Sequence, residues 1–227
     1  VSLTEPGEKL LSDSRRIIAL LDQTQAALQA DQLNGRVRIG IPDEYGVSVL
    51  PGVLGKFATS NPGVEVTVRC GGSDDLHAAV AAGALDLAVM FEETVRPGSE
   101  ILTNDPTVWV TSNEFCMHEF DPVPVAVYEN ECWCRDWALE SLDQQGQNYR
   151  VAFTSDSSDG LQAAVTSGLA IAPLSRSNIP ENCRELTSED GYWNFLTSNV
   201  VLRFRSGARS AATESMAATL REEFINY

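Results

Sequence analysis

CGGSDDLHAAVAAGALDLAVMF, residues 70–91, contains a turn, a helix and a strand in direct succession. After the Gly-Gly turn, Ser73 can cap a helix over Asp74–Ala82, and Gly83 can end it because glycine readily adopts the conformation found there. Leu85–Phe91 is then almost continuously apolar, as expected of a strand that is covered on both faces of a parallel sheet. The stretch therefore predicts an α/β fold.

The residues before this stretch continue the same alternation toward the N-terminus. Arg36–Ile41 and Val64–Cys70 have the composition of strands, and Tyr45–Thr59 carries apolar residues at helical spacing between them. A β-α-β-α-β order within about 55 residues is typical of a doubly wound, Rossmann-like lobe.

The second half of the chain repeats this order of elements without repeating the sequence. Ile101–Ser112 is an extended run that lies between the two halves. The elements predicted after it are a strand at Val123–Tyr128, a helix at Trp133–Gln145, a strand at Tyr149–Thr154, a helix at Ser158–Thr166, strands at Gly168–Leu174 and Val200–Arg205, and an amphipathic helix at Ser210–Ile225. We expect lobe I to span residues 36–111 and 198–227, and lobe II to span residues 112–197.

Residues 1–35 precede the lobes and read mainly as one long helix. Leu10, Ile17, Leu21 and Leu28 follow one another at spacings of seven, four and seven, which is a heptad-like apolar stripe. A helix of this kind, with only a short link to the lobes, favours dimerisation with a second copy of itself. The alternative is a helix that packs against its own lobes.

Composition limits the classes of partner. The formal net charge is −16, and an acidic surface repels the DNA backbone, although a generally acidic proteome would produce the same charge. No apolar run approaches the length of a membrane span, and the N-terminus lacks the pattern of a signal peptide. Five cysteines at irregular spacing argue against a disulfide framework, so we expect a reduced, cytoplasmic setting.

Motifs of known enzyme classes are absent from the sequence. His77 and His118 are the only histidines, and we expect both to be surface or packing residues. Cys132 and Cys134 form a CxC pair, but no second pair follows at zinc-like spacing. We therefore expect no catalytic residue, no metal and no cofactor.

The loops that follow the strands are the remaining candidates for a site. In doubly wound sheets, ligands bind beyond the carboxyl ends of the strands. Three such loops carry short polar residues: Pro42-Asp43-Glu44, Gly71-Gly72-Ser73 and Thr154-Ser155-Asp156-Ser157. They suit a small polar ligand, and the alternative for each loop is ordinary helix capping.

Four stretches resemble the effector-binding domain of LysR-type transcriptional regulators. They are VRIGIP (37–42), LPGVLGKFATSNPGVEV (50–66), CGGSDDLHAAVAAGALDLAVM (70–90) and VAFTSDSSDGLQAAVTSGLAIAPLS (151–175). VSLTEPGEKLL (1–11) resembles the junction of that family, where a winged helix-turn-helix ends at residues 1–4 and a linker helix begins. The order and spacing of these stretches along the chain are more specific than any one of them.

The resemblance implies a fold like that of type 2 periplasmic binding proteins, with two lobes joined by two crossover strands. It implies a homodimer or homotetramer, a small-molecule effector bound between the lobes, and contact with DNA only through the missing N-terminal domain. By position, the effector-binding residues would be Asp43, Glu44, Ser73, Phe91, Thr154, Ser155 and Asp156, and Trp109 would lie near a crossover.

This sequence departs from the family pattern at Asp43-Glu44. Many relatives have Ser or Thr there to hold an acidic effector, so a cationic or neutral polar effector becomes the hypothesis. Two other functions remain open. A solute-binding protein of a transport system would have the same fold, but would carry a secretion signal and lack the linker helix. An enzyme on this fold is disfavoured by the scarcity of histidine.

Overall fold

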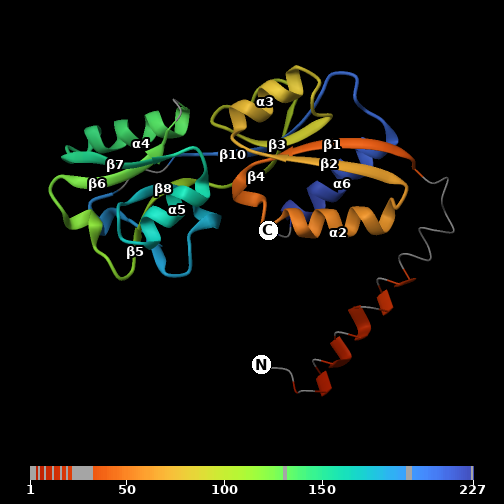
Figure 1. Ribbon diagram of the computed structural model, residues 1–227, viewed down its shortest axis with the longest axis horizontal. Coiled ribbons are helices and arrows are strands. Elements are labelled where there is room, and N and C mark those ends of the chain that lie inside the picture. Colours follow the sequence, from red (N-terminus) through yellow and green to blue (C-terminus); the bar gives the residue numbers. More distant parts are fainter. Residues whose placement is uncertain are drawn as a thin grey trace.

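The computed structural model describes residues 4, 6–7, 9–11, 13–15, 17–18, 20–21, 33–129, 132–192, 196–225 and 227. Two α/β lobes lie side by side, and the described residues between 6 and 21 are mostly helical and lie apart from both lobes (Figure 1). The architecture agrees with the predicted pair of doubly wound lobes.

Lobe I contains a five-stranded sheet in the order β2-β1-β3-β10-β4. At its centre, β1 (Gly35–Ile41) pairs in parallel with β2 (Val64–Cys70) and with β3 (Leu87–Glu92). The strand β10 (Asn199–Phe204) returns from lobe II and pairs antiparallel with β3 and with β4 (Ser99–Asn104). The carboxyl ends of the three parallel strands therefore lie at one edge of the sheet.

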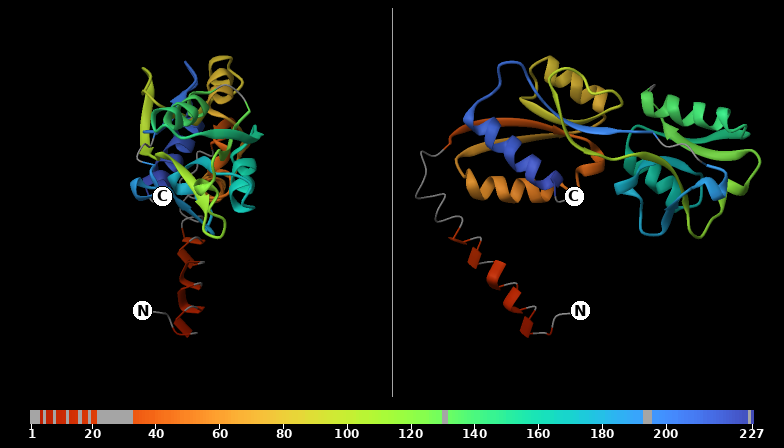
Figure 2. Two further views of the ribbon diagram at one scale, coloured as in Figure 1. Left: turned by 90° about the vertical axis from the view of Figure 1, so that its left-hand side faces the viewer. Right: turned by 180° about the vertical axis from the view of Figure 1, so that it is seen from behind.

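Helices cover both faces of this sheet (Figures 1 and 2). On one face lie α2 (Leu50–Ser60) and α6 (Ala211–Ile225), and on the other lies α3 (Ser73–Ala81). Successive residues of β3 serve the two faces, since Val89 packs in the core with α2 and α6 whereas Met90 packs in the core with α3. This double coverage explains why the strand is apolar at every position from Leu87 to Phe91 rather than at alternate ones.

Lobe II is arranged in the same way. Helix α4 (Trp133–Gln144) covers one face of its strands with Trp109 and Ile171 beneath it, and helix α5 (Ser158–Thr166) covers the other with Leu161 and Ala172. Backbone hydrogen bonds of Ile171 with Ala126 and Pro124 join the strand pair to the other three strands. The elements of lobe II are β5 (Thr107–Ser112), β6 (Val123–Tyr128), α4 (Trp133–Gln144), β7 (Tyr149–Ser155), α5 (Ser158–Thr166), β8 (Ala172–Ser175) and β9 (Cys183–Glu185).

Two crossover segments connect the lobes and pair with each other. Thr107 N donates to Leu196 O at 3.0 Å, and Leu196 N donates to Thr107 O at 2.9 Å. Asp105 N donates to Ser198 O at 3.0 Å. The connection between the lobes is thus a two-stranded ribbon, on which rotation of the lobes would be centred.

The boundary between the lobes differs from the expected one. Because β5 pairs with β8 and β9, residues 107–111 belong with the strands of lobe II rather than with those of lobe I. The run Ile101–Ser112 forms two strands instead of one, since Asp105 and Pro106 separate β4 from β5 and proline has no N–H for a ladder.

Local structure differs from expectation at two helix starts. The predicted helix over Tyr45–Thr59 begins at Leu50, and before it lies the short 3-10 turn η1 (Asp43–Tyr45). The cap of α3 is Gly72 without a side-chain bond, and the Ser73 hydroxyl instead accepts a hydrogen bond from Phe91 N at 2.9 Å. The other 3-10 turns are η2 (Met117–Glu119), η3 (Arg176–Asn178) and η4 (Ser188–Asp190).

The apolar stripe of the N-terminal helix is open to solvent in this chain. The side chains of Leu10, Ile17 and Leu21 are 68%, 59% and 62% exposed, and Leu28 lies outside the described residues. Among the helices that the structure describes, none is both long enough and apolar enough to cross a lipid bilayer. The five cysteines are all free thiols.

Candidate functional site

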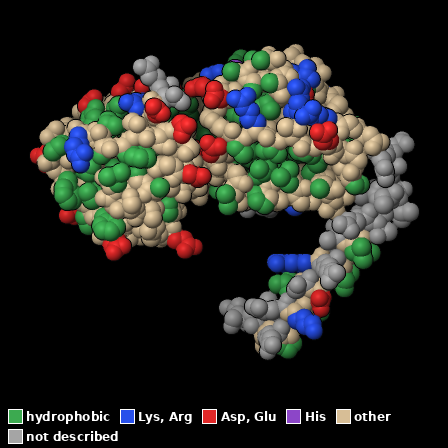
Figure 3. All heavy atoms as spheres, viewed as in Figure 1, with side chains coloured by type: hydrophobic (Ala, Val, Ile, Leu, Met, Phe, Trp, Pro, Cys, Tyr) green, Lys and Arg blue, Asp and Glu red, His purple; other side chains and the backbone are tan. Residues whose placement is uncertain are grey.

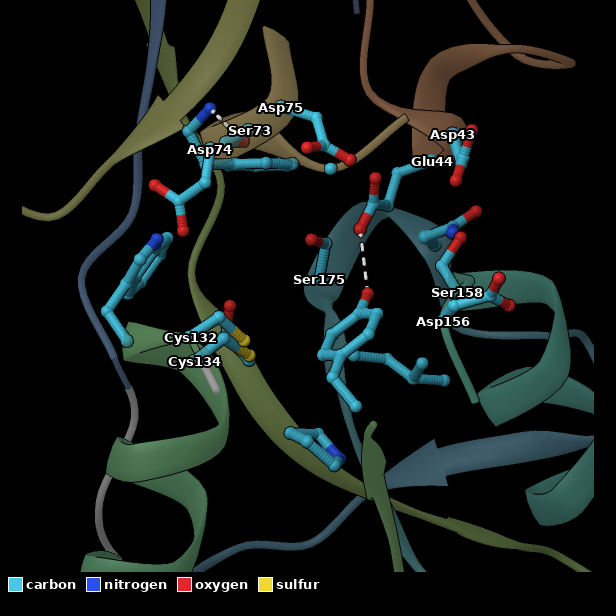
Figure 4. A pocket seen from close by; sticks show the side chains of 18 residues that line it. Asp43, Glu44, Ser73, Asp74, Asp75, Cys132, Cys134, Asp156, Ser158 and Ser175 are labelled. Carbon is cyan, nitrogen blue, oxygen red and sulfur yellow. Dashed lines mark hydrogen bonds between the residues drawn. The ribbon is translucent and has the colours of Figure 1, made fainter. Parts of the chain in front are cut away.

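A cavity of about 340 Å³ lies between the two lobes, beyond the carboxyl ends of their parallel strands (Figure 4). Both lobes contribute side chains to it. Its carboxylates are Asp43, Glu44, Asp74, Asp75 and Asp156, its aromatic residues are Phe91, Tyr128 and Trp133, and its other residues are Gly72, Ser73, Thr107, Cys132, Cys134, Ser158, Pro173, Leu174, Ser175 and Asn178. Among the lining residues that the structure describes, none is Lys, Arg or His.

Glu44 and Tyr128 are in direct contact in the wall of the cavity, and a dashed line at Glu44 marks their hydrogen bond (Figure 4). Glu44 is in η1 of lobe I and Tyr128 ends β6 of lobe II, and the phenol donates to Glu44 Oε1 at 3.0 Å. Burial raises the pKa of Glu44, while the bond from Tyr128 acts in the opposite direction. Burial also raises the pKa of Tyr128, so the phenol stays protonated and remains a donor.

Asp43 lies beside the carboxylates of the second lobe. Burial raises its pKa, and the charges of Asp159 and Asp156 raise it further. Asp43 is at the end of β1 and Asp156 follows β7, so negative charges from the two lobes are brought together where the lobes meet. Asp and Glu side chains gather along this junction on the molecular surface (Figure 3).

Asp105 links the two lobes at the crossover. Its carboxylate accepts a hydrogen bond from the Tyr45 hydroxyl at 2.8 Å, on the side of lobe I. It also accepts from the backbone N–H of Ser177 at 3.1 Å and from the Ser177 hydroxyl, on the side of lobe II. Tyr45 in turn stacks on Phe91, with ring centroids 5.5 Å apart, and so connects this carboxylate to the wall of the cavity.

Ser158 places a hydroxyl in the cavity wall without a hydrogen-bond partner. The residue begins α5 and is only 2% exposed, and no described group bonds its Oγ atom. Figure 4 shows Ser158 on the same side of the cavity as Asp43 and Asp156. A buried hydroxyl without a partner is uncommon in folded proteins, because losing water without replacing its bonds costs free energy.

Five of the seven residues predicted as effector contacts line the cavity, namely Asp43, Glu44, Ser73, Phe91 and Asp156. Thr154 and Ser155 do not. Thr154 is exposed, and the Ser155 hydroxyl accepts from Ser157 N at 3.2 Å in the turn before α5. Trp109 is also outside the cavity, because it is buried beneath α4 and its indole N–H donates to Ser141 at 2.9 Å.

Tyr128, Ser158 and two cysteines also form part of this wall and were not among the predicted contacts. Tyr128 ends a predicted strand, so the rule that selected the other loops also applied to it. Cys132 and Cys134 both line the cavity, and burial raises the pKa of each thiol. Within the described ranges, no three His, Cys, Asp or Glu residues are grouped so that they could hold a metal ion.

Comparison with known proteins places this chain among transcriptional regulators. A family model described as LysR substrate binding domain matches residues 30–225. The HTH-type transcriptional regulator DgdR of Burkholderia cepacia is 29% identical over 221 residues, which cover 97% of this chain and 75% of that protein. Relatives of this kind are named as regulators and not as enzymes.

Solved structures share the two-lobed fold. The structure of HinK, a LysR family transcriptional regulator from Pseudomonas aeruginosa, has a TM-score of 0.65 at 17% identity and covers 98% of this chain and 81% of its own. The BenM effector binding domain, solved with its effector benzoate, has a TM-score of 0.62 at 14% identity and covers 86% of this chain and 94% of its own. These likenesses bear out the expected fold, which is like that of type 2 periplasmic binding proteins.

Proposed function

The chain belongs to the LysR substrate binding domain family, and from this premise we propose that its lobes sense the small-molecule effector of a LysR-type transcriptional regulator. The observation that carries the proposal is the cavity of about 340 Å³ lined by side chains from both lobes. That volume lies within the range of small-molecule sites, about 300–1,000 Å³. The BenM effector domain, which shares the fold, is described with a small molecule as its effector.

The effector acts by shifting an equilibrium between lobe arrangements. A ligand that touches residues of both lobes binds more tightly when the lobes are close together, and only such a difference in affinity can shift the population. Asp43, Glu44, Ser73 and Phe91 provide contacts from lobe I, and Asp156 provides contacts from lobe II. Closing the lobes on the ligand changes the angle across the crossover ribbon, and this is the signal that the protein transmits.

The signal reaches DNA through an oligomer. Leu10, Ile17 and Leu21 form an exposed apolar stripe, which suits a homodimer or homotetramer built by pairing linker helices. DNA is contacted by a domain outside the 227 residues of this sequence, since the acidic lobes themselves repel phosphate. A regulator that works in this way acts in the cytoplasm.

A thermal-shift screen against a metabolite library tests this function, because a ligand of the native state raises its melting temperature. Gly72 provides a specific blocking variant. It lines the cavity at φ −65°, and a Cβ placed on it would meet nothing within 4 Å, so Gly72→Leu adds a bulky side chain at the cavity wall without backbone strain.

The matched control is Gly55→Leu on the exposed side of α2, where a Cβ also meets nothing within 4 Å. We expect at least one compound to stabilise the unmodified protein and the Gly55→Leu variant but not the Gly72→Leu variant. A library without any stabilising compound, or a compound that stabilises all three proteins equally, would contradict the proposed function.

A further inference from the structure

We propose that the effector is a small organic cation, an amine or guanidinium with a short apolar body, held by Asp43, Glu44, Asp156 and Ser158. This inference rests on the proposed function and names the chemical class of the ligand at that same site. Four observations lead to it: the sign of the charge in the cavity, two carboxylates without an ion-pair partner, an unpartnered hydroxyl, and the aromatic and apolar residues in the rest of the wall.

The charge of the cavity has one sign. Five carboxylates line it, and no Lys, Arg or His is among the described lining residues. An anionic ligand would bring like charges together beside Asp43 and Glu44, which are both partly buried, so their repulsion is stronger than in bulk solvent. A cation would replace that repulsion by attraction, and neither a neutral nor an anionic ligand can do this.

The carboxylates nearest the junction of the lobes, Asp43 and Glu44, form no ion pair with a Lys, Arg or His among the described residues. Burial raises the pKa of Asp43, and two other carboxylates, Asp159 and Asp156, raise it further. Burial raises the pKa of Glu44 as well, with the charge of Asp43 acting in the same direction. Both groups would regain a favourable environment if a positive charge entered the cavity.

Ser158 points to the ligand independently of the charges. Its hydroxyl is 2% exposed, lines the cavity and has no hydrogen-bond partner within the described residues. Oγ can accept a hydrogen bond from an N–H group, and an ammonium or guanidinium offers several such donors. The residue lies on the side of the cavity that also holds Asp43 and Asp156 (Figure 4).

The rest of the wall suits a carbon skeleton rather than a bare ion. Phe91, Trp133 and Leu174 line the cavity together with the carboxylates. Aromatic faces attract cations and pack against apolar groups. A metal ion would require several ligands converging on one point, and no such group of three is found in the described part of the chain.

The test uses three probes that share a ring and differ in charge: benzylamine, benzyl alcohol and benzoate. Binding to the protein is measured by isothermal titration calorimetry at neutral pH and low salt. We expect benzylamine to bind at least about tenfold more tightly than benzyl alcohol, a difference in the range of one charge-assisted contact. We expect no detectable binding of benzoate, and weaker binding of benzylamine as salt is added.

Two variants test whether the carboxylates of the cavity, rather than those elsewhere on the surface, bind the cation. Asp43→Asn removes a carboxylate from the cavity, and Glu140→Gln removes one from the exposed surface of α4. We expect the first to weaken benzylamine binding about tenfold and the second to leave it unchanged. Ser158→Ala should weaken binding without lowering the melting temperature of the free protein, because the hydroxyl has no partner to lose.

Several outcomes would overturn the inference. They are tighter binding of benzoate or benzyl alcohol than of benzylamine, no binding of benzylamine at millimolar concentration, equal effects of Asp43→Asn and Glu140→Gln, and displacement of benzylamine by magnesium chloride but not by sodium chloride of the same ionic strength. Binding of benzoate that Gly72→Leu abolishes would overturn the cationic class and leave the sensing function intact. Failure of the whole metabolite library would instead remove the function on which the inference rests.

Discussion

The Tyr128 hydroxyl donates a hydrogen bond to Glu44 Oε1 at 3.0 Å, and the two residues belong to different lobes. The bond therefore forms only when the lobes are close together. Both groups are buried enough for their pKa values to be raised, so neither side chain is well hydrated in this arrangement. The pair stabilises the closed arrangement and forms part of the cavity wall.

Replacing Tyr128 with Phe removes the donor and leaves the Glu44 carboxylate buried without it. We expect a loss of about 1–3 kcal/mol in the free energy of the closed arrangement, the usual cost of an unsatisfied buried group. Small-angle X-ray scattering of the ligand-free protein should show a larger radius of gyration. The control is Tyr149→Phe, whose hydroxyl bonds Asp143 within lobe II. Equal radii of gyration for the two variants would show that the bond does not hold the lobes together.

Glu44→Gln should change how stability depends on pH. Burial raises the pKa of Glu44 in the folded protein above its usual 4.5, so the folded state keeps a proton that the unfolded state releases. Stability due to this group therefore falls as pH rises from 4.5 through the raised pKa. At pH 7 the variant should melt at a higher temperature than the unmodified protein, and the difference should vanish below the usual pKa. The control Glu65→Gln, at an exposed site, should show no such change. If the higher melting temperature of Glu44→Gln persisted in acid, ionisation of Glu44 would not be its cause.

Asp86 is a carboxylate whose pKa is lowered in the folded protein, whereas that of Glu44 is raised. Hydrogen bonds from Arg38 at 2.7 Å and from Arg205 at 3.2 Å lower its pKa from 3.8 to about 2, although its burial opposes the shift. The stabilisation is present above pH 3.8 and is lost as pH falls toward 2. Asp86→Asn should cost about 1–2 kcal/mol at pH 7, after allowance for the partly exposed arginines. Urea unfolding of both proteins at pH 7 and in acid measures this difference in the free energy of unfolding. An equal loss at the two pH values would contradict the dependence on the ionisation of Asp86.

The exposed apolar stripe predicts the effect of charge on oligomerisation. Ile17→Glu combined with Leu21→Glu places carboxylates where two linker helices would meet. We expect a lower molar mass by size-exclusion chromatography with light scattering, because like charges in a coiled-coil seam oppose pairing. Val47→Glu replaces another exposed apolar residue, 88% exposed, in lobe I and should leave the mass unchanged. A double variant of unchanged mass would mean that the oligomer forms through other surfaces.

The sequence predicts a helix or strand well where a local pattern of apolar residues is enough to determine it. The apolar run that became β3 and the helical spacing that became α5 are both local patterns, and both elements appear where predicted. The three-residue strand β9 was not predicted, because its pairing with β5 depends on residues more than seventy positions away. The lobe boundary could not be predicted for the same reason, since only the pairing of β5 with the distant strands β8 and β9 assigns it to lobe II.

Residues that line the cavity could be anticipated where they follow the ends of strands. Asp43, Glu44 and Asp156 could be selected because each follows a strand at the edge where ligands bind. Ser155 met the same criterion, but its hydroxyl is used inside the turn by Ser157 N. The free hydroxyl of Ser158 could not be anticipated, because a missing partner is a property of the packed structure and not of any sequence pattern.

The shared carboxylate of Asp105 has a consequence for the kind of signal the protein can send. Tyr45 and Ser177 bond it from opposite lobes at the crossover. A small rotation of one lobe stretches these hydrogen bonds, and a larger rotation breaks them. Arrangements with an intermediate angle between the lobes therefore have the highest free energy. The angle between the lobes therefore does not change continuously with the concentration of the effector. We therefore expect each molecule to occupy one of two lobe arrangements, and a graded response to arise only from the fraction of molecules in each.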